Sequence, residues 1–155
     1  MAPMVSDQTR RNLRRAAIAA VRGCADKMET QATGLLESLP TAAISEALRA
    51  NTLELAAGLK DASGRVTFEL ALLQAELADQ KAVAATAVKR LSAMDATMMA
   101  AVAALTDVVE QLEAAAERDE RHEPAFVLVI EATGVLLQAL EEARAATEAL
   151  GAAMR

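Results

Sequence analysis

Residues 65–123 contain neither glycine nor proline, and this uninterrupted stretch constrains the fold more than any other feature. An apolar or small side chain recurs within it at steps of three and four residues, the spacing that keeps one side of a helix against a partner. The pattern lasts for about seven heptads, with a gap at Gln80. It predicts one very long central helix over residues 65–121, between Gly64 and Pro124.

The apolar positions of this helix form its expected contact surface, which we call the seam. At about 1.5 Å per residue, a helix of this length leaves part of its seam uncovered by shorter neighbours. The sequence therefore predicts a homo-oligomer, a dimer or higher, with antiparallel coiled-coil character. The candidate seam residues are Leu70, Leu73, Leu77, Leu91, Met94, Met98, Leu105, Val108 and Leu112.

Three further helices complete a single all-α domain, an elongated antiparallel bundle of four helices. They are expected over about residues 7–38, 42–62 and 125–153, with residues 1–5 frayed. The alternative is a compact five-helix bundle in which the long helix breaks near Ser92, because the serine-to-acid spacing there is that of a capping box.

The last helix is expected to be the most deeply buried. Its first half, at residues 127–130 and 135–137, is apolar nearly all round, so it should be buried on more than one side. The residues expected to face the core are Phe126, Val127, Ile130, Leu137, Leu140 and Leu150.

The composition favours thin contacts between helices over a thick core. Hydrophobic residues make up 54% of the chain but aromatic residues only 1%, and alanine carries much of the apolar count. Alanine favours the helix and allows helix backbones to approach closely. Clusters of β-branched and aromatic residues bounded by turns do not occur, so β-structure is not expected.

The charge of the chain is unevenly distributed. A net charge of −6 opposes non-specific binding of nucleic acid, yet four arginines lie close together near the N-terminus. They form a candidate anion-binding patch for nucleic acid or anionic lipid. Alternatively, they pair with acids on another helix or subunit. The patch consists of Arg10, Arg11, Arg14 and Arg15.

Enzymatic chemistry is not expected. His122, the only histidine, precedes Glu123 and Pro124 at an expected turn, so we interpret it as a solvated side chain and not as a phosphotransfer histidine. Cys24, the only cysteine, lies on an apolar side of a helix with no histidine close in sequence. Because no phosphate-binding loop, zinc spacing or pair of Glu-x-x-His motifs occurs, neither a cofactor nor a metal is expected.

Three functions remain open. The first is an oligomeric scaffold, adaptor or chaperone that binds a partner protein through apolar helix faces. The second follows from composition alone: most of the chain resembles phasins, the helical proteins that coat bacterial polyester granules, in being rich in alanine and leucine and nearly free of aromatic residues. The third is a binder of nucleic acid or anionic membrane through the arginine patch. The composition argues against both partners without eliminating them.

The sequence also bears on location. No segment has the roughly 18–20 uninterrupted apolar residues of a membrane span, and the apolar run after the arginines is too short for a secretory signal. We therefore expect a cytoplasmic protein. The alanine and arginine content suggests a GC-rich bacterial genome.

Overall fold

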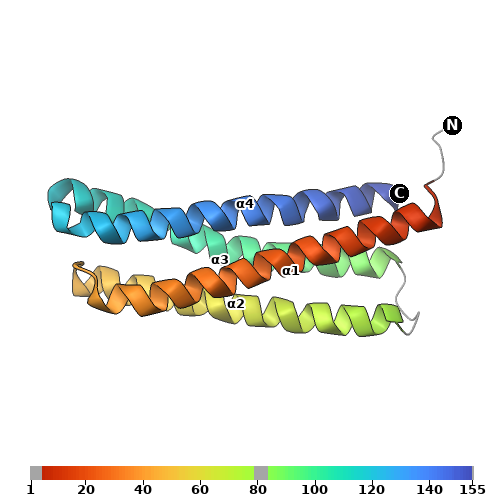
Figure 1. The fold of residues 1–155 in the computed structure, drawn as a ribbon, viewed down its shortest axis with the longest axis horizontal. Helices are drawn as coiled ribbons and strands as arrows, with labels where there is room; N and C mark the ends of the chain where they lie inside the picture. The colour runs from red at the N-terminus through yellow and green to blue at the C-terminus, as the bar shows by residue number, and fades with distance from the viewer. Residues whose placement is uncertain (1–4, 79–83, 155) are drawn as a thin grey trace.

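The computed structural model describes residues 5–78 and 84–154 of the 155-residue chain. Within these residues the chain forms α1 (Asp7–Ser38), the short 3-10 helix η1 (Leu39–Thr41), α2 (Glu46–Ala78), α3 (Ala84–Arg118), the 3-10 helix η2 (Glu120–His122) and α4 (Glu123–Ala153). The four α-helices lie side by side and run alternately in opposite directions (Figure 1). The predicted all-α antiparallel bundle of four helices is therefore confirmed.

The helices form a ring in chain order. α1 and α3 each pack against both α2 and α4, and α1 also touches α3 across the centre. The turns at η1 and η2 lie at one end of the bundle, whereas α1 begins and α4 ends at the other (Figure 1). Alanine occupies many of the buried positions on α1 and α4, whereas the buried positions of α3 are mainly leucine, methionine and valine.

The single long helix predicted over residues 65–121 is wrong. α2 runs through Gly64 to Ala78, and α3 begins at Ala84 and returns alongside α2 (Figure 1). The gap in the heptad pattern at Gln80 lies outside the described residues. The predicted seam thus belongs to two antiparallel helices of one hairpin.

The five-helix alternative is wrong as well, because α3 continues without interruption through residues 92–95. The first helix has the predicted bounds. α2 begins at Glu46 and not at residue 42, and α4 begins at Glu123 and not at residue 125.

Packing against α1 explains why α2 does not end at Ser63 and Gly64. Ser63 is 2% exposed, and its Oγ donates a 2.6 Å hydrogen bond to the carbonyl oxygen of Ala25 on α1. The core side of α2 continues beyond this point with Leu70 and Leu73, which are 1% exposed or less. A glycine within a helix costs about 1 kcal/mol, whereas burying each leucine contributes roughly 1.5–3 kcal/mol. The burial outweighs the cost of Gly64.

Serine caps mark the starts of α1 and α2, and a proline marks the start of α4. Ser6 Oγ accepts a 3.1 Å hydrogen bond from the backbone N–H of Thr9 at the start of α1. Ser45 Oγ accepts a 3.3 Å hydrogen bond from the N–H of Leu48 at the start of α2. Pro124 lies in the first turn of α4, where its missing N–H leaves no hydrogen bond unmade.

Candidate interaction surface

Five large apolar side chains on the first half of α4 are exposed. Their exposed fractions lie between 39% and 49%. We call this set the outer face of α4, and it consists of Val127, Leu128, Ile130, Val135 and Leu137.

The outer face results from which side α4 turns to the core. That side carries Val129 and Leu136, both fully buried, together with a series of alanines. Residues 124–130 are apolar without interruption, and a helix that contacts a bundle on one side leaves the opposite side of such a segment exposed. This uninterrupted run is the sequence signal for the outer face, although it does not reveal which residues point outward.

The predicted core side of α4 is wrong in part. Leu140 and Leu150 are buried as predicted, and Phe126 is half-buried. Three other residues predicted to face the core belong to the exposed outer face: Val127, Ile130 and Leu137. The first half of α4 is therefore buried on one side only, whereas its apolar composition predicted burial on more than one side.

Smaller apolar areas are exposed on two other helices. Phe68 and Leu72, one turn apart on α2, are 65% and 45% exposed. Met99 on α3 is 38% exposed, and its sulfur lies 3.2 Å from Nη2 of Arg144 on α4. The outer face of α4 is thus the largest grouping of exposed large apolar side chains among the described residues.

Two segments are long and apolar enough to cross a membrane, judged by length and composition alone: Thr86–Arg118 and Glu120–Ala153. Only 28% and 39% of their most apolar windows are buried inside the bundle. Core helices of water-exposed bundles meet the same criterion, so the finding is weak evidence for a membrane span. Of the two helices, α4 exposes several large apolar side chains, whereas the exposed apolar residues of α3 are mainly alanines, with Met99 its one exposed large apolar side chain among the described residues.

The candidate seam residues lie inside the single chain. All of them except Leu77 are at most 1% exposed, and Leu77 is half-buried. Those on α2 are Leu70, Leu73 and Leu77, and those on α3 are Leu91, Met94, Met98, Leu105, Val108 and Leu112. Because these residues are covered by the chain's own helices, the seam does not require a second copy of the chain to cover it.

The arginine patch lies in the first turns of α1. Arg10 and Arg14 are half-buried, whereas Arg11 and Arg15 are exposed. Within residues 5–78 and 84–154, no ion pair joins any of the four to an acid. The Nε atom of Arg10 is buried there without a hydrogen-bond partner. The structure therefore brings the four together but pairs them with no acid in the part of the chain that it describes.

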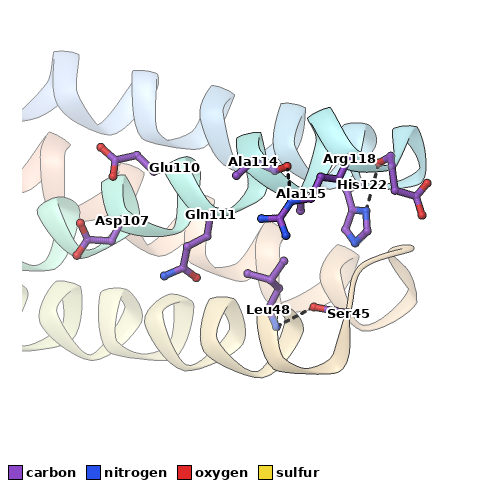
Figure 2. Close-up of a pocket in the computed structure, with 10 residues that line it drawn as sticks. Ser45, Leu48, Asp107, Glu110, Gln111, Ala114, Ala115, Arg118 and His122 are labelled. Atoms are coloured by element: carbon purple, nitrogen blue, oxygen red, sulfur yellow. Dashed lines mark hydrogen bonds between the residues drawn. The ribbon is translucent and has the colours of Figure 1, made fainter.

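A groove of about 770 Å³ lies between the start of α2 and the second half of α3. Figure 2 shows acids and an amide from α3 on one side of it and the start of α2 on the other. Its lining includes Ser45, Leu48, Asp107, Glu110, Gln111 and Arg118. No group of three potential metal ligands is present among the described residues.

His122 lies at the end of this groove. It is half-buried, contrary to the prediction of a solvated ring, and its Nδ1 is 3.2 Å from the carbonyl oxygen of Asp119 (Figure 2). The side chain of Arg121 donates to the carboxylate of Asp119, which lowers the pKa of that carboxyl to about 2. These contacts join neighbouring residues of one turn and stabilise the local conformation around η2.

Cys24 is buried in the core and 1% exposed. Burial raises the pKa of its thiol from 9.0 to about 11; the nearby charge of Asp95 also raises it, whereas Lys27 lowers it. Because the thiolate is the reactive form, the folded protein should react with a disulfide reagent at pH 8 at least about tenfold more slowly than the urea-unfolded protein. Equal rates in the two states would contradict this placement of Cys24.

The same shift gives a pH dependence of stability. The folded state holds the thiol proton to higher pH than the unfolded state, so the contribution is fully present below about pH 9 and is lost as the pH rises towards 11. Urea titrations of the protein and of a Cys24→Ala control measure it. The difference between the two should shrink over that window.

Comparison of the chain with known protein families, with curated proteins and with solved structures finds no match.

Proposed function

We propose that this protein is a non-enzymatic helical interaction protein, a scaffold, adaptor or chaperone that binds its partner through the outer face of α4. The observation that carries the proposal is the exposure of five large apolar side chains on one half of one helix, outside a core that the chain covers by itself. Exposed apolar patches of this kind mark interaction sites on protein surfaces. The cytoplasm is the expected place of action.

The size of the outer face limits the affinity that it can provide. Each of the five side chains is about two-fifths exposed, so covering it contributes roughly 1 kcal/mol. Association costs at least about 4 kcal/mol in lost freedom of motion. The five side chains alone therefore barely offset that cost, and the partner must also cover their neighbours. We expect reversible binding centred on this face.

Photo-crosslinking in the native host tests the proposal. A photoreactive amino acid in place of Ile130 should yield a discrete crosslinked product. The same amino acid in place of Ala149, which is exposed on the second half of α4, should yield little. The product from position 130 should be reduced at least about fivefold by Leu128→Gln together with Leu137→Gln, since two apolar contacts of roughly 1 kcal/mol are lost.

A matched control carries Ala145→Gln and Ala149→Gln, which place the same two side chains at exposed positions of the same helix. This control should leave the product at position 130 unchanged. Circular dichroism should show all variants fully helical. Equal crosslinking at positions 130 and 149, or equal loss in both double variants, would contradict a specific role for the outer face.

A second candidate is a coat on an apolar surface, as the compositional resemblance to phasins implies. The specific observation in its favour is that α4 exposes five large apolar side chains and α3 exposes Met99 and a series of alanines. Purified protein should then move from water onto triglyceride droplets or polyester granules. Retention in the aqueous phase, with unchanged helicity, would rule out the coat and leave the first proposal unaffected.

A further inference from the structure

The unpaired charges on α4 are all negative. Its glutamates are exposed, and none of them forms an ion pair with a cation in residues 5–78 and 84–154. The one cation of the helix, Arg144, is half-buried and forms an ion pair with Asp95 on α3, with 3.4 Å between Nε and Oδ2. The helix therefore presents carboxylates to a partner and no free cation. These glutamates are Glu123, Glu131, Glu141, Glu142 and Glu148.

Three of the glutamates border the outer face of α4. Glu123 lies one turn before Val127, and Glu141 lies one turn after Leu137. Glu131 lies between them, one turn after Val127. Carboxylates therefore accompany the apolar side chains along the whole outer face, which extends roughly 27 Å from Glu123 to Glu141.

The start of the outer face contains a hollow with the same combination of groups. This hollow, of about 660 Å³, is lined by the apolar side chains of Pro124, Val127 and Leu128 and by the glutamates Glu120 and Glu123. A lysine or arginine side chain lays its aliphatic stem along apolar surface and keeps its charged end with polar groups. The lining of the hollow therefore suits a long cationic side chain of a partner.

The smaller apolar area on α2 has a different charge pattern. Phe68 and Leu72 are accompanied by exposed residues of both signs, Arg65 and Glu69. A partner of either charge would meet one attractive and one repulsive group there. Selection of a cationic partner is therefore expected at the outer face of α4 and not on α2.

The backbone of α4 favours a helical partner. α4 is one continuous helix from Glu123 to Ala153, so its inner N–H and C=O groups are already hydrogen-bonded to one another. An extended segment would bring its own unpaired backbone groups onto an apolar surface, which is unfavourable. A helical segment satisfies those groups internally and presents an apolar stripe.

We propose that the outer face of α4 binds a basic amphipathic helix of a partner protein. The apolar stripe of that helix covers the outer face, and its lysine or arginine side chains pair with the glutamates beside it. The inference rests on the proposed function, since it uses the same face, and it adds the chemical class of the partner. The same glutamates repel an anionic membrane or a nucleic acid.

Fluorescence anisotropy with three synthetic peptides of about 18 residues tests the proposal. The first peptide is an amphipathic helix of leucine, lysine and alanine. The second has glutamate in place of lysine, and the third has the composition of the first with the leucines scattered, so that no apolar stripe forms. The first should bind at least about tenfold more tightly than either of the others. Its affinity should fall as the salt is raised from about 0.05 to 0.5 M.

Removal of the bordering carboxylates should weaken this binding. A variant with Glu123→Gln, Glu131→Gln and Glu141→Gln should bind the first peptide at least about fivefold more weakly, because three exposed charge pairs are lost. Leu128→Gln together with Leu137→Gln should weaken it to a similar degree through the loss of apolar contact. Circular dichroism should show both variants fully helical.

The matched control removes three exposed carboxylates from α2, which lies diagonally across the bundle from α4. It changes the net charge by the same amount as the α4 variant, so a general effect of charge would appear in both. The control should bind the first peptide like the unaltered protein. Its substitutions are Glu54→Gln, Asp61→Asn and Glu69→Gln.

Each outcome decides the inference. Preference for the first peptide, weakened by both α4 variants and not by the control, supports it. No binding of the first peptide, equal binding of the second or third, or equal weakening in the α4 and control variants overturns it. Binding to phosphatidylglycerol vesicles that is lost in Leu128→Gln/Leu137→Gln also overturns it, because the face would then contact a membrane.

Photo-crosslinking from position 130 in the native host separates this inference from the proposed function. The three glutamine substitutions on α4 should reduce the crosslinked product at least about fivefold, as they do for the peptide. A discrete crosslinked protein whose yield they leave unchanged would overturn the basic helix as the partner. The proposed function would then stand with a partner of different chemistry.

Discussion

Leu105→Ala should lower the free energy of unfolding by about 2–5 kcal/mol, by the same amount at low and at high protein concentration. Leu105 is fully buried on α3 within the main core cluster. Its truncation removes apolar contacts and leaves a cavity that neighbouring helices fill only in part. If Leu105 instead faced a second copy, its truncation would weaken association, and the cost would depend on concentration.

Urea unfolding followed by circular dichroism at two concentrations measures this effect. Leu72→Ala is the control, because Leu72 is 45% exposed on α2 and its truncation should cost less than about 1 kcal/mol. A dimer that dissociates on Leu105→Ala, with no change in the stability of the monomer, would contradict the assignment of the seam to the core.

Gly64→Pro should destabilise the protein by about 3 kcal/mol or more, because Gly64 lies well inside α2. Proline there removes a helix hydrogen bond, and its ring clashes with the carbonyl group one turn before it. If Gly64 instead ended a helix in the left-handed conformation, proline at this position would be unfavourable too, because its φ is fixed near −65°. Gly64→Pro therefore measures the cost of interrupting α2 and does not by itself separate the two placements.

Gly64→Ala separates the two placements, because the sign of its effect on stability differs between them. A Cβ at Gly64 would meet nothing within 4 Å, and the backbone there is helical. The substitution should raise the free energy of unfolding by up to about 1 kcal/mol. A glycine in a left-handed stop would give a loss instead. Thermal melts of the two variants provide the comparison, and a destabilising alanine would contradict a continuous α2.

The sequence predicts which side of each middle helix is apolar better than it predicts where those helices end. Leu70 on α2 and Leu105 on α3 are both in the predicted seam, and both are buried. Heptad spacing indicates that a helix contacts an apolar neighbour. The spacing is the same whether the neighbour is a helix of another chain or the second helix of a hairpin in the same chain. No glycine or proline lies between Gly64 and Pro124. The one signal in the pattern is its gap at Gln80, between the end of α2 at Ala78 and the start of α3 at Ala84, and a single gap does not by itself distinguish a reversal from a continuous helix.

Two misinterpretations came from residues whose roles depend on distant parts of the chain. Ser63 suggests a turn in sequence, yet its hydroxyl bonds to Ala25 on α1. Val127 suggests a core position, yet α4 turns its alanine-rich side inward and leaves Val127 40% exposed. In a segment such as residues 124–130, where every residue is apolar, the hydrophobic periodicity does not indicate which side of the helix is buried. Tertiary packing determines that side.

The beginning of α1 and the end of α4 lie at the same end of the bundle, opposite the turns at η1 and η2 (Figure 1). A short linker between them would close the chain, and new termini could be opened in the turn between Ser38 and Glu46 without cutting any α-helix. Such a circular permutant keeps every helix–helix contact while changing the order in which the ribosome makes the helices. The same arrangement of the four helices should therefore form whichever helix is synthesised first.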